Sequence, residues 1–259
     1  MEIIDFHTHP FKDIKTNICN HRSYCFNPTP IKSMEYLKQM GINKICGSVI
    51  LKDTTDNTGF EAVKEENDIM LELKAIYKDF YIPGFRVHPD FVEESLTEIE
   101  RMHKLGINLI GEIIPQSHEY EKYTSKAFYE ILDLAKNYNM IVSIHSMEPD
   151  AMDKLVADNK DLIIVAAHPG ELDYYIRHLA RMKKYENYYL DLSGTGLFRH
   201  AMLRRGIDEC GEERFLFGTD YPVCNPAMFI GGIMFDLLLS DKEKEAIFSK
   251  NAKRLLKLS

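Results

Sequence analysis

The chain has 259 residues, and its 32 Lys and Arg against 40 Asp and Glu give a formal net charge of −8. With 45% hydrophobic and 28% charged residues, it has the composition of an ordinary globular protein that can bury a core of its own. An acidic chain without a basic cluster is a poor partner for nucleic acid, and no apolar run approaches the ~20 residues of a membrane span.

Eight short segments rich in apolar residues alternate with amphipathic stretches along the chain. In order, the expected strands are residues 2–6, 44–50, 80–87, 108–113, 140–144, 162–167, 188–192 and 214–218. Most are apolar on both faces, which is typical of parallel strands covered by helices. The stretches between them, such as 93–105 and 125–138, repeat apolar residues at the spacing of one helix face.

Eight such units in about 250 residues predict one (β/α)₈ barrel domain that spans residues 1–259. A doubly wound open sheet is the competing fold, but the glycine-rich phosphate turn typical of it does not follow the first expected strand. The longest irregular segments, 11–30 and 51–58, follow the first two strands. We expect both on the C-terminal face of the barrel, where they could shape a substrate site.

Side chains of the types that bind metals follow several of these strands. His7 and His9 come at the end of the first strand, and side chains two residues apart on a strand point to the same face. The fourth, fifth, sixth and eighth strands end at Glu112, His145, His168 and Asp220. Six buried ionisable groups would be costly without a cation to pair them. The sequence therefore predicts a divalent-metal site at the end of the barrel where active sites form.

Other polar residues near the expected strand ends have two interpretations. Arg86 and His88 close the third strand and could contact a substrate, although Arg86 could equally pair with an acid of the chain. Asp191 and Ser193 end the seventh strand, where they could hold a ligand histidine or cap the next helix, and the structural role is favoured. His178 lies in a helical stretch and is expected to be solvated.

Four motifs together resemble the amidohydrolase superfamily. They are DFHTH at 5–9, IHS at 144–146, AHPG at 167–170 and FGTDYP at 217–222, and the last two look like its amidohydrolase-related branch. The resemblance covers nearly the whole chain and implies a metal-dependent (β/α)₈ barrel. It implies that His7, His9, His145 and Asp220 bind one divalent ion. It also implies that His168 either faces the substrate as a polarising group or binds a second metal.

Glu112 departs from the superfamily members in which a carboxylated lysine on the fourth strand lies between two metals. A glutamate at this position is similar to TatD-type deoxyribonucleases, in which it can bridge two metals. The resemblance therefore leaves one or two ions open. Zinc is the expected metal, although histidine and carboxylate ligands also suit other divalent ions.

The expected function is hydrolysis of a small-molecule ester, lactone or amide. In this mechanism a zinc-like ion lowers the pKa of its water to roughly 7, Asp220 takes the proton, and His168 or the ion stabilises the oxyanion. Three alternatives stay open. They are a metal-dependent decarboxylase or hydratase of the same branch, a TatD-like phosphodiesterase or nuclease, and a non-catalytic metal-binding barrel.

The expected partner is a small-molecule substrate, with no nucleic acid and no membrane. The five cysteines are scattered and odd in number, which argues against a disulfide framework and for the cytoplasm. An exposed apolar face on a loop or helix could support a homodimer.

Overall fold

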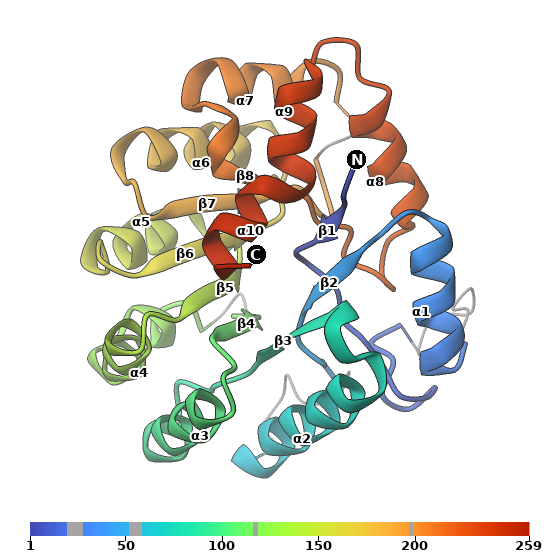
Figure 1. Cartoon of the computed structure of the whole chain (residues 1–259). Helices are drawn as coiled ribbons and strands as arrows, with labels where there is room; N and C mark the ends of the chain where they lie inside the picture. The colour runs from blue at the N-terminus through green and yellow to red at the C-terminus, as the bar shows by residue number, and fades with distance from the viewer. Residues whose placement is uncertain (20–27, 52–58, 116–118, 197–198, 259) are drawn as a thin grey trace.

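The computed structural model describes residues 1–19, 28–51, 59–115, 119–196 and 199–258. Eight parallel strands form one sheet, and their order in the sheet follows the order in the chain (Figure 1). The strands are β1 (Ile4–Asp5), β2 (Lys44–Gly47), β3 (Tyr81–Phe85), β4 (Leu109–Ile113), β5 (Ile141–His145), β6 (Ile163–Ala167), β7 (Tyr188–Asp191) and β8 (Phe215–Leu216). Each overlaps one of the segments expected from the sequence.

The first and last strands meet and complete the barrel. The Phe6 amide donates to the Phe217 carbonyl at 2.8 Å, and Thr8 forms a parallel bridge with Tyr221. These contacts lie beyond the regular ladders, which is why β1 and β8 have only two residues each although longer strands were expected. The architecture is the predicted (β/α)₈ barrel.

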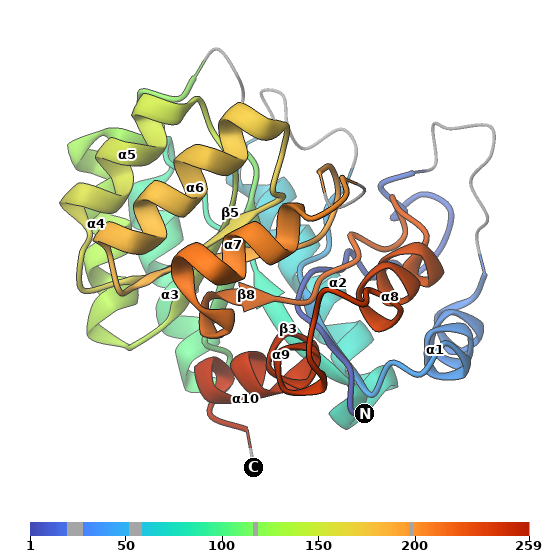
Figure 2. The ribbon, with the colours of Figure 1, turned by 90° about the horizontal axis from the view of Figure 1, so that it is seen from above.

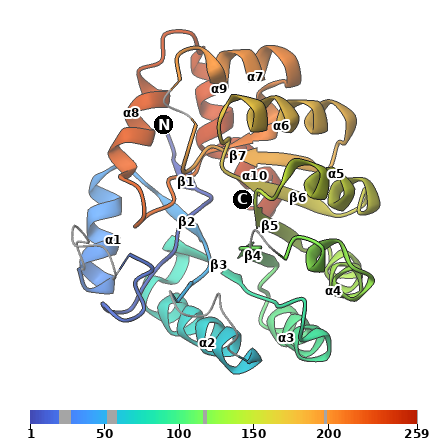
Figure 3. The same cartoon turned by 180° about the vertical axis from the view of Figure 1, so that it is seen from behind.

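Helices follow the strands and surround the sheet (Figure 3). They are α1 (Pro30–Gln39), α2 (Phe60–Tyr77), α3 (Val92–Lys104), α4 (Lys126–Asn137), α5 (Pro149–Asp158), α6 (Leu172–Lys184), α7 (Met202–Cys210), α8 (Pro226–Met234), α9 (Asp241–Glu245) and α10 (Asn251–Leu256). Helix α4 shows how the sequence sets their bounds. Ser125 caps it by accepting from the Phe128 amide, and the apolar stripe from Phe128 to Ala135 is buried.

The buried apolar residues form two clusters, one inside the barrel and one between the strands and the helices. The inner cluster contains one or two residues from most strands and is closed by Ala252 and Leu255 of α10. Both chain termini and α10 lie at the end from which the strands start (Figure 2). Apolar side chains fill that end. The polar residues come after the strands in the chain, so they gather at the opposite end of the barrel.

Two of the sequence expectations fall partly outside the described residues. The irregular segments 11–30 and 51–58 include residues 20–27 and 52–58, so their part in a substrate site stays a prediction. Within the described ranges, no helix is both long and apolar enough to cross a membrane.

Candidate metal-binding site

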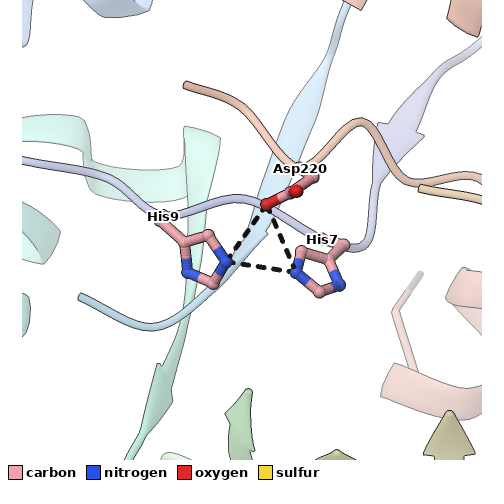
Figure 4. Close-up of side chains that lie close together, drawn as sticks. All are labelled: His7, His9 and Asp220. Carbon is pink, nitrogen blue, oxygen red and sulfur yellow. Dashed lines mark hydrogen bonds and ion pairs between the residues drawn. The ribbon is translucent and has the colours of Figure 1, made fainter. Parts of the chain in front are cut away.

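His7, His9 and Asp220 lie together (Figure 4), because backbone hydrogen bonds join the segments that follow β1 and β8. The Asp220 amide donates to the His7 carbonyl at 2.8 Å, and the His9 amide donates to the Tyr221 carbonyl at 2.7 Å. Asp220 has a left-handed backbone, with φ of 60°, which is uncommon outside glycine and is found at functional sites. Thr8 turns away, since its hydroxyl donates to the Cys46 carbonyl.

The spacing of the three side chains fits a single divalent ion. Nε2 of His7 lies 3.2 Å from Nε2 of His9, and Asp220 Oδ1 lies 3.3 Å from His9 Nε2 and 3.8 Å from His7 Nε2. Ligand atoms about 2.1 Å from one ion lie about 3.0 Å apart in octahedral geometry and about 3.4 Å apart in tetrahedral geometry. All three residues are at most 7% exposed, so water does not separate their charges from one another.

The hydrogen bonds of Nδ1 in His7 and His9 indicate whether each Nε2 can bind a metal. His7 Nδ1 lies 2.9 Å from Asp191 Oδ2, and His9 Nδ1 lies 3.1 Å from the Ser48 carbonyl oxygen. Both partners are acceptors, so each Nδ1 carries a proton and each Nε2 can offer a lone pair. Two lone pairs and a carboxylate oxygen then converge, which requires a positive charge between them.

That charge can be a proton or a metal ion. Burial lowers the pKa of His9, but hydrogen bonds with Asp220 and Glu112 outweigh it and raise the pKa to about 9. A divalent cation replaces such protons in sites built from histidine and carboxylate. The donor set therefore fits the metal that the sequence predicts.

Glu112 lies between this group and a second group of histidines. Its Oε2 is 3.5 Å from Nε2 of both His7 and His9, while its Oε1 is 2.9 Å from His145 Nδ1 and 3.7 Å from His168 Nε2. Burial raises the pKa of the Glu112 carboxyl, but the neighbouring imidazoles of His7 and His145 hold it well below its usual value. Glu112 is therefore an anion facing both groups.

The expected metal ligands thus fall into two neighbouring sets. His7, His9 and Asp220 form one compact group, and Glu112, His145 and His168 form another. The structure places His145 against Glu112, and the prediction that it binds one ion together with His7, His9 and Asp220 stays a prediction. The two sets lie side by side, with the carboxylate of Glu112 facing both.

Asp191 and Ser193 act on the site histidines. Asp191 Oδ2 contacts His7 as described, and Ser193 Oγ lies 3.0 Å from Nδ1 of His168. Of the two interpretations drawn from the sequence, the one in which these residues hold histidines is realised. The signal was present in the sequence, because both residues stand at a strand end beside other site residues.

Arg86 and His88 lie apart from the histidine groups. The Arg86 guanidinium is buried and donates to both oxygens of Glu66, at 2.7 and 2.8 Å. Arg86 therefore pairs with an acid of the chain, which is one of the two interpretations drawn from the sequence. His88 is half-buried, and its Nδ1 accepts from the Asp90 amide at 3.1 Å. A substrate contact by His88 stays a prediction.

The chain belongs to the amidohydrolase family, whose family model matches residues 4–258. None of the curated proteins compared with it matches significantly. Among solved structures it is similar to 2,6-dihydroxybenzoate decarboxylase from Rhizobium, with 17% identity over 99% of this chain and 98% of that one and a TM-score of 0.76.

Two further structures extend this comparison. A dihydroxybenzoic acid decarboxylase from Polaromonas sp. JS666, with bound manganese and the inhibitor 2-nitroresorcinol, shares 18% identity over 99% of this chain and 97% of that one, with a TM-score of 0.71. A Pseudomonas putida protein provisionally named as a 2-pyrone-4,6-dicarboxylic acid hydrolase shares 17% identity over 98% and 97%, with a TM-score of 0.70. At such identities the likeness concerns the fold, which these decarboxylases and the protein named as a hydrolase share.

Proposed function

We propose that this protein is a metal-dependent hydrolase that cleaves an ester, lactone or amide bond of a small molecule. The observation that supports it most is the convergence of His7 Nε2, His9 Nε2 and Asp220 Oδ1 within 3.8 Å of one another, with Glu112 Oε2 beside them. These residues would hold the ion, and zinc is the metal we propose. Bound there, the ion would lower the pKa of a water molecule into the neutral range.

Asp220 and His168 are the proposed catalytic residues. Asp220 Oδ1 lies 3.3 Å from His9 Nε2 and 3.8 Å from His7 Nε2, so its carboxylate could accept a proton from a water held at this place and return it to the leaving group. His168 lies on the other side of Glu112, with Nε2 3.7 Å from Glu112 Oε1. Substrate would therefore lie between these two side chains.

Charge favours hydrolysis over decarboxylation at this site. Asp220 and Glu112 together can balance both charges of a divalent ion, so a substrate carboxylate would gain little further attraction. The second candidate is a non-oxidative decarboxylase, which the similarity to two dihydroxybenzoate decarboxylases over nearly the whole chain supports. An uncharged ester, lactone or amide would meet no electrostatic penalty, which is why hydrolysis is placed first.

Metal content and activity measured on the same preparations test the proposal. We expect wild-type protein to bind zinc and to hydrolyse members of an ester, lactone and amide panel. His7→Ala combined with His9→Ala should remove the metal, while Asp220→Asn should keep the fold and lower kcat about 10²–10⁴-fold. His103→Ala, which changes an exposed histidine on α3, is the matched control and should retain both properties.

The same panel separates the alternatives. Dihydroxybenzoates are followed by carbon dioxide release, and a bis-aryl phosphate reports phosphodiesterase activity. Carbon dioxide release without hydrolysis would establish the decarboxylase in place of the hydrolase. Unchanged metal content in the double histidine variant would show that the assignment of the site is wrong.

A further inference from the structure

Helix α8 is apolar on both of its faces. Its residues, PAMFIGGIM, include no charged side chain, whereas α3 carries Glu and Lys side chains at exposed positions. Phe229 and Ile233 are buried against the rest of the chain, and Met228 lies exposed on the other face. The ribbon views show α8 on the outside of the barrel beside α1 (Figures 1 and 2). A helix that is apolar all round is normally covered on both sides.

The three most exposed large apolar side chains of the described residues lie within ten consecutive positions. They belong to Met228, Phe235 and Leu237, which are 71%, 79% and 95% exposed. Met228 and Phe235 are seven residues apart, which places them on one face of the helix, and Leu237 follows in the turn after it. We call these three residues and Leu238 the α8 patch. Exposed apolar side chains that adjoin one another in this way mark a contact surface.

Hydrogen bonds hold the turn that displays Leu237. Asp236 Oδ1 accepts from the Leu238 amide at 2.8 Å, and the Arg204 guanidinium donates to the Leu238 carbonyl at 3.2 Å. Arg204 also pairs with Glu243 at 2.7 Å, so charged groups border the patch without entering it. Because the turn is already ordered, little conformational entropy has to be lost when a partner covers it.

Two glycines lie on the outer part of α8. Neither Gly231 nor Gly232 has a positive φ, and a Cβ atom at either position would meet no heavy atom of the described chain within 4 Å. Glycine weakens a helix relative to alanine, and no contact within the described residues requires it here. A second backbone that approaches α8 closely gives these glycines a use.

We propose that the α8 patch is the contact surface of a homodimer, in which α8 of one copy packs against α8 of a second copy about a twofold axis. The net charge of −8 makes two copies repel each other, and α8 is a surface that brings no like charges together. A twofold contact places the same patch on both partners, so apolar side chains meet apolar side chains. A membrane is a poorer occupant, because helices that lie on membranes carry Lys and Arg on their polar face and α8 has neither.

The apolar area of the patch is of the size that a stable dimer needs. Leu238 is 40% exposed, and with the three larger contributions the four side chains present roughly 500 Å² to solvent. A standard interface buries about 800 Å² on each partner, of which roughly 60% is apolar. The α8 patch therefore matches the apolar centre of such an interface, and Arg204 and Glu243 would lie in its polar rim.

The mass of the full chain in solution tests the proposal. In analytical ultracentrifugation from about 1 to about 100 μM, we expect the mass to rise to twice the 30.1 kDa of one chain. A single-chain mass at the highest concentration would overturn the proposal. The inference goes beyond the proposed function and does not rest on it, because the mass is measured without substrate.

Asp substitutions on the patch test where the two copies meet. Met228→Asp combined with Phe235→Asp should raise the dimer Kd at least about 100-fold, because two copies would then bring like charges together at the centre of the interface. Leu105→Asp combined with Leu172→Asp is the matched control, since it adds the same charge at exposed apolar positions of α3 and α6 and should leave the dimer intact. A dimer that persists unchanged in the α8 variant would contradict the proposal.

Hydrogen exchange of the wild-type protein decides the question even if the α8 variant does not fold. Amides of α8 should exchange more slowly at about 100 μM than at about 1 μM, whereas those of α3 should exchange equally at both. A dimer with unchanged exchange in α8 would show that another surface makes the contact. A monomer that instead binds vesicles of phosphatidylcholine and phosphatidylserine would assign the patch to a lipid surface and overturn the homodimer.

Discussion

Glu112 is the residue on which the number of metal ions depends. Its two oxygens face different partners, with His7 and His9 near Oε2 and His145 near Oε1. A carboxylate in this position can complete one site and accept a hydrogen bond, or it can bridge two ions. The 2.9 Å contact with His145 Nδ1 is a normal charge-assisted hydrogen bond, which already uses Oε1.

We therefore expect one tightly bound ion in the wild-type protein. Glu112→Gln keeps the shape of the side chain but removes its negative charge, so it should weaken zinc binding about 10–100-fold while one ion still binds at saturating metal. Elemental analysis and competition with a chelator measure the two quantities. Two ions in the wild type and one in the variant would show instead that Glu112 bridges.

His178 shows how a residue type can mislead when only the sequence is available. It was expected to be solvated, but it is 1% exposed, and its ring lies between the Tyr188 hydroxyl at 2.7 Å and the Ser146 hydroxyl at 3.3 Å. His178 lies on the buried face of α6 with Tyr175, Leu179 and Met182, and the many charged residues of this helix made that face hard to recognise in the sequence. Burial, assisted by the charge of Arg181, lowers the pKa of His178 to about 3.

This shift predicts a loss of stability in acid. Between about pH 6.5 and pH 3, His178 is protonated in the unfolded chain and neutral in the folded chain. The free energy of unfolding therefore falls as pH falls, by up to about 1.4 kcal/mol per pH unit. His178→Gln does not titrate and is less stable at pH 7. The stability gap between wild type and the variant should therefore narrow from pH 7 to pH 4.5 in urea unfolding, and a constant gap would contradict the pKa shift.

At the scale of elements, the sequence predicted which segments become strands but not how their ends meet. Each apolar segment could be located, because parallel strands covered on both faces are nearly continuous apolar runs. The contacts between β1 and β8 join residues more than 200 positions apart in the sequence, such as Asp5 and Thr219. Local patterns carry no information about such pairs.

Gly47, at the end of β2, leads to a prediction about the candidate metal site. Gly47 has φ of 140°, and a Cβ there would lie 1.9 Å from the Thr8 carbonyl oxygen, in the segment that holds His7 and His9. Gly47→Ala should therefore lower the free energy of unfolding by about 2–4 kcal/mol and weaken metal binding at least about 10-fold.

Gly106→Ala is the matched control for this substitution. Gly106 also has a positive φ, of 75°, but no heavy atom lies within 4 Å of the Cβ position. The variant should lose only about 1–2 kcal/mol from backbone strain and should bind metal like the wild type. Urea unfolding and metal titration of both variants measure the difference, and equal metal affinities would show that the end of β2 does not support the site.

At the scale of the whole molecule, the candidate metal site lies where the first and last strands of the sheet meet. His7 and His9 follow the first strand, and Asp220 follows the last, so an ion bound to all three links the strands whose contact closes the barrel. The sequence showed the ligand types at these strand ends, and the fold explains why they meet. The order of strands in the sheet, which places β1 beside β8, is a property of the complete barrel.

An ion that binds only the folded chain must stabilise it. At a free metal concentration 100 times the Kd, the gain is about 2.7 kcal/mol, which for a chain of this length corresponds to a rise in Tm of about 5–10 °C. Zinc added to metal-free protein should produce this rise, a chelator should reverse it, and the combined His7→Ala and His9→Ala variant should show neither. The rise should shrink on acidification, because protons compete with the metal for the two imidazoles. An equal rise in the double variant would show that the ion stabilises the barrel from another place.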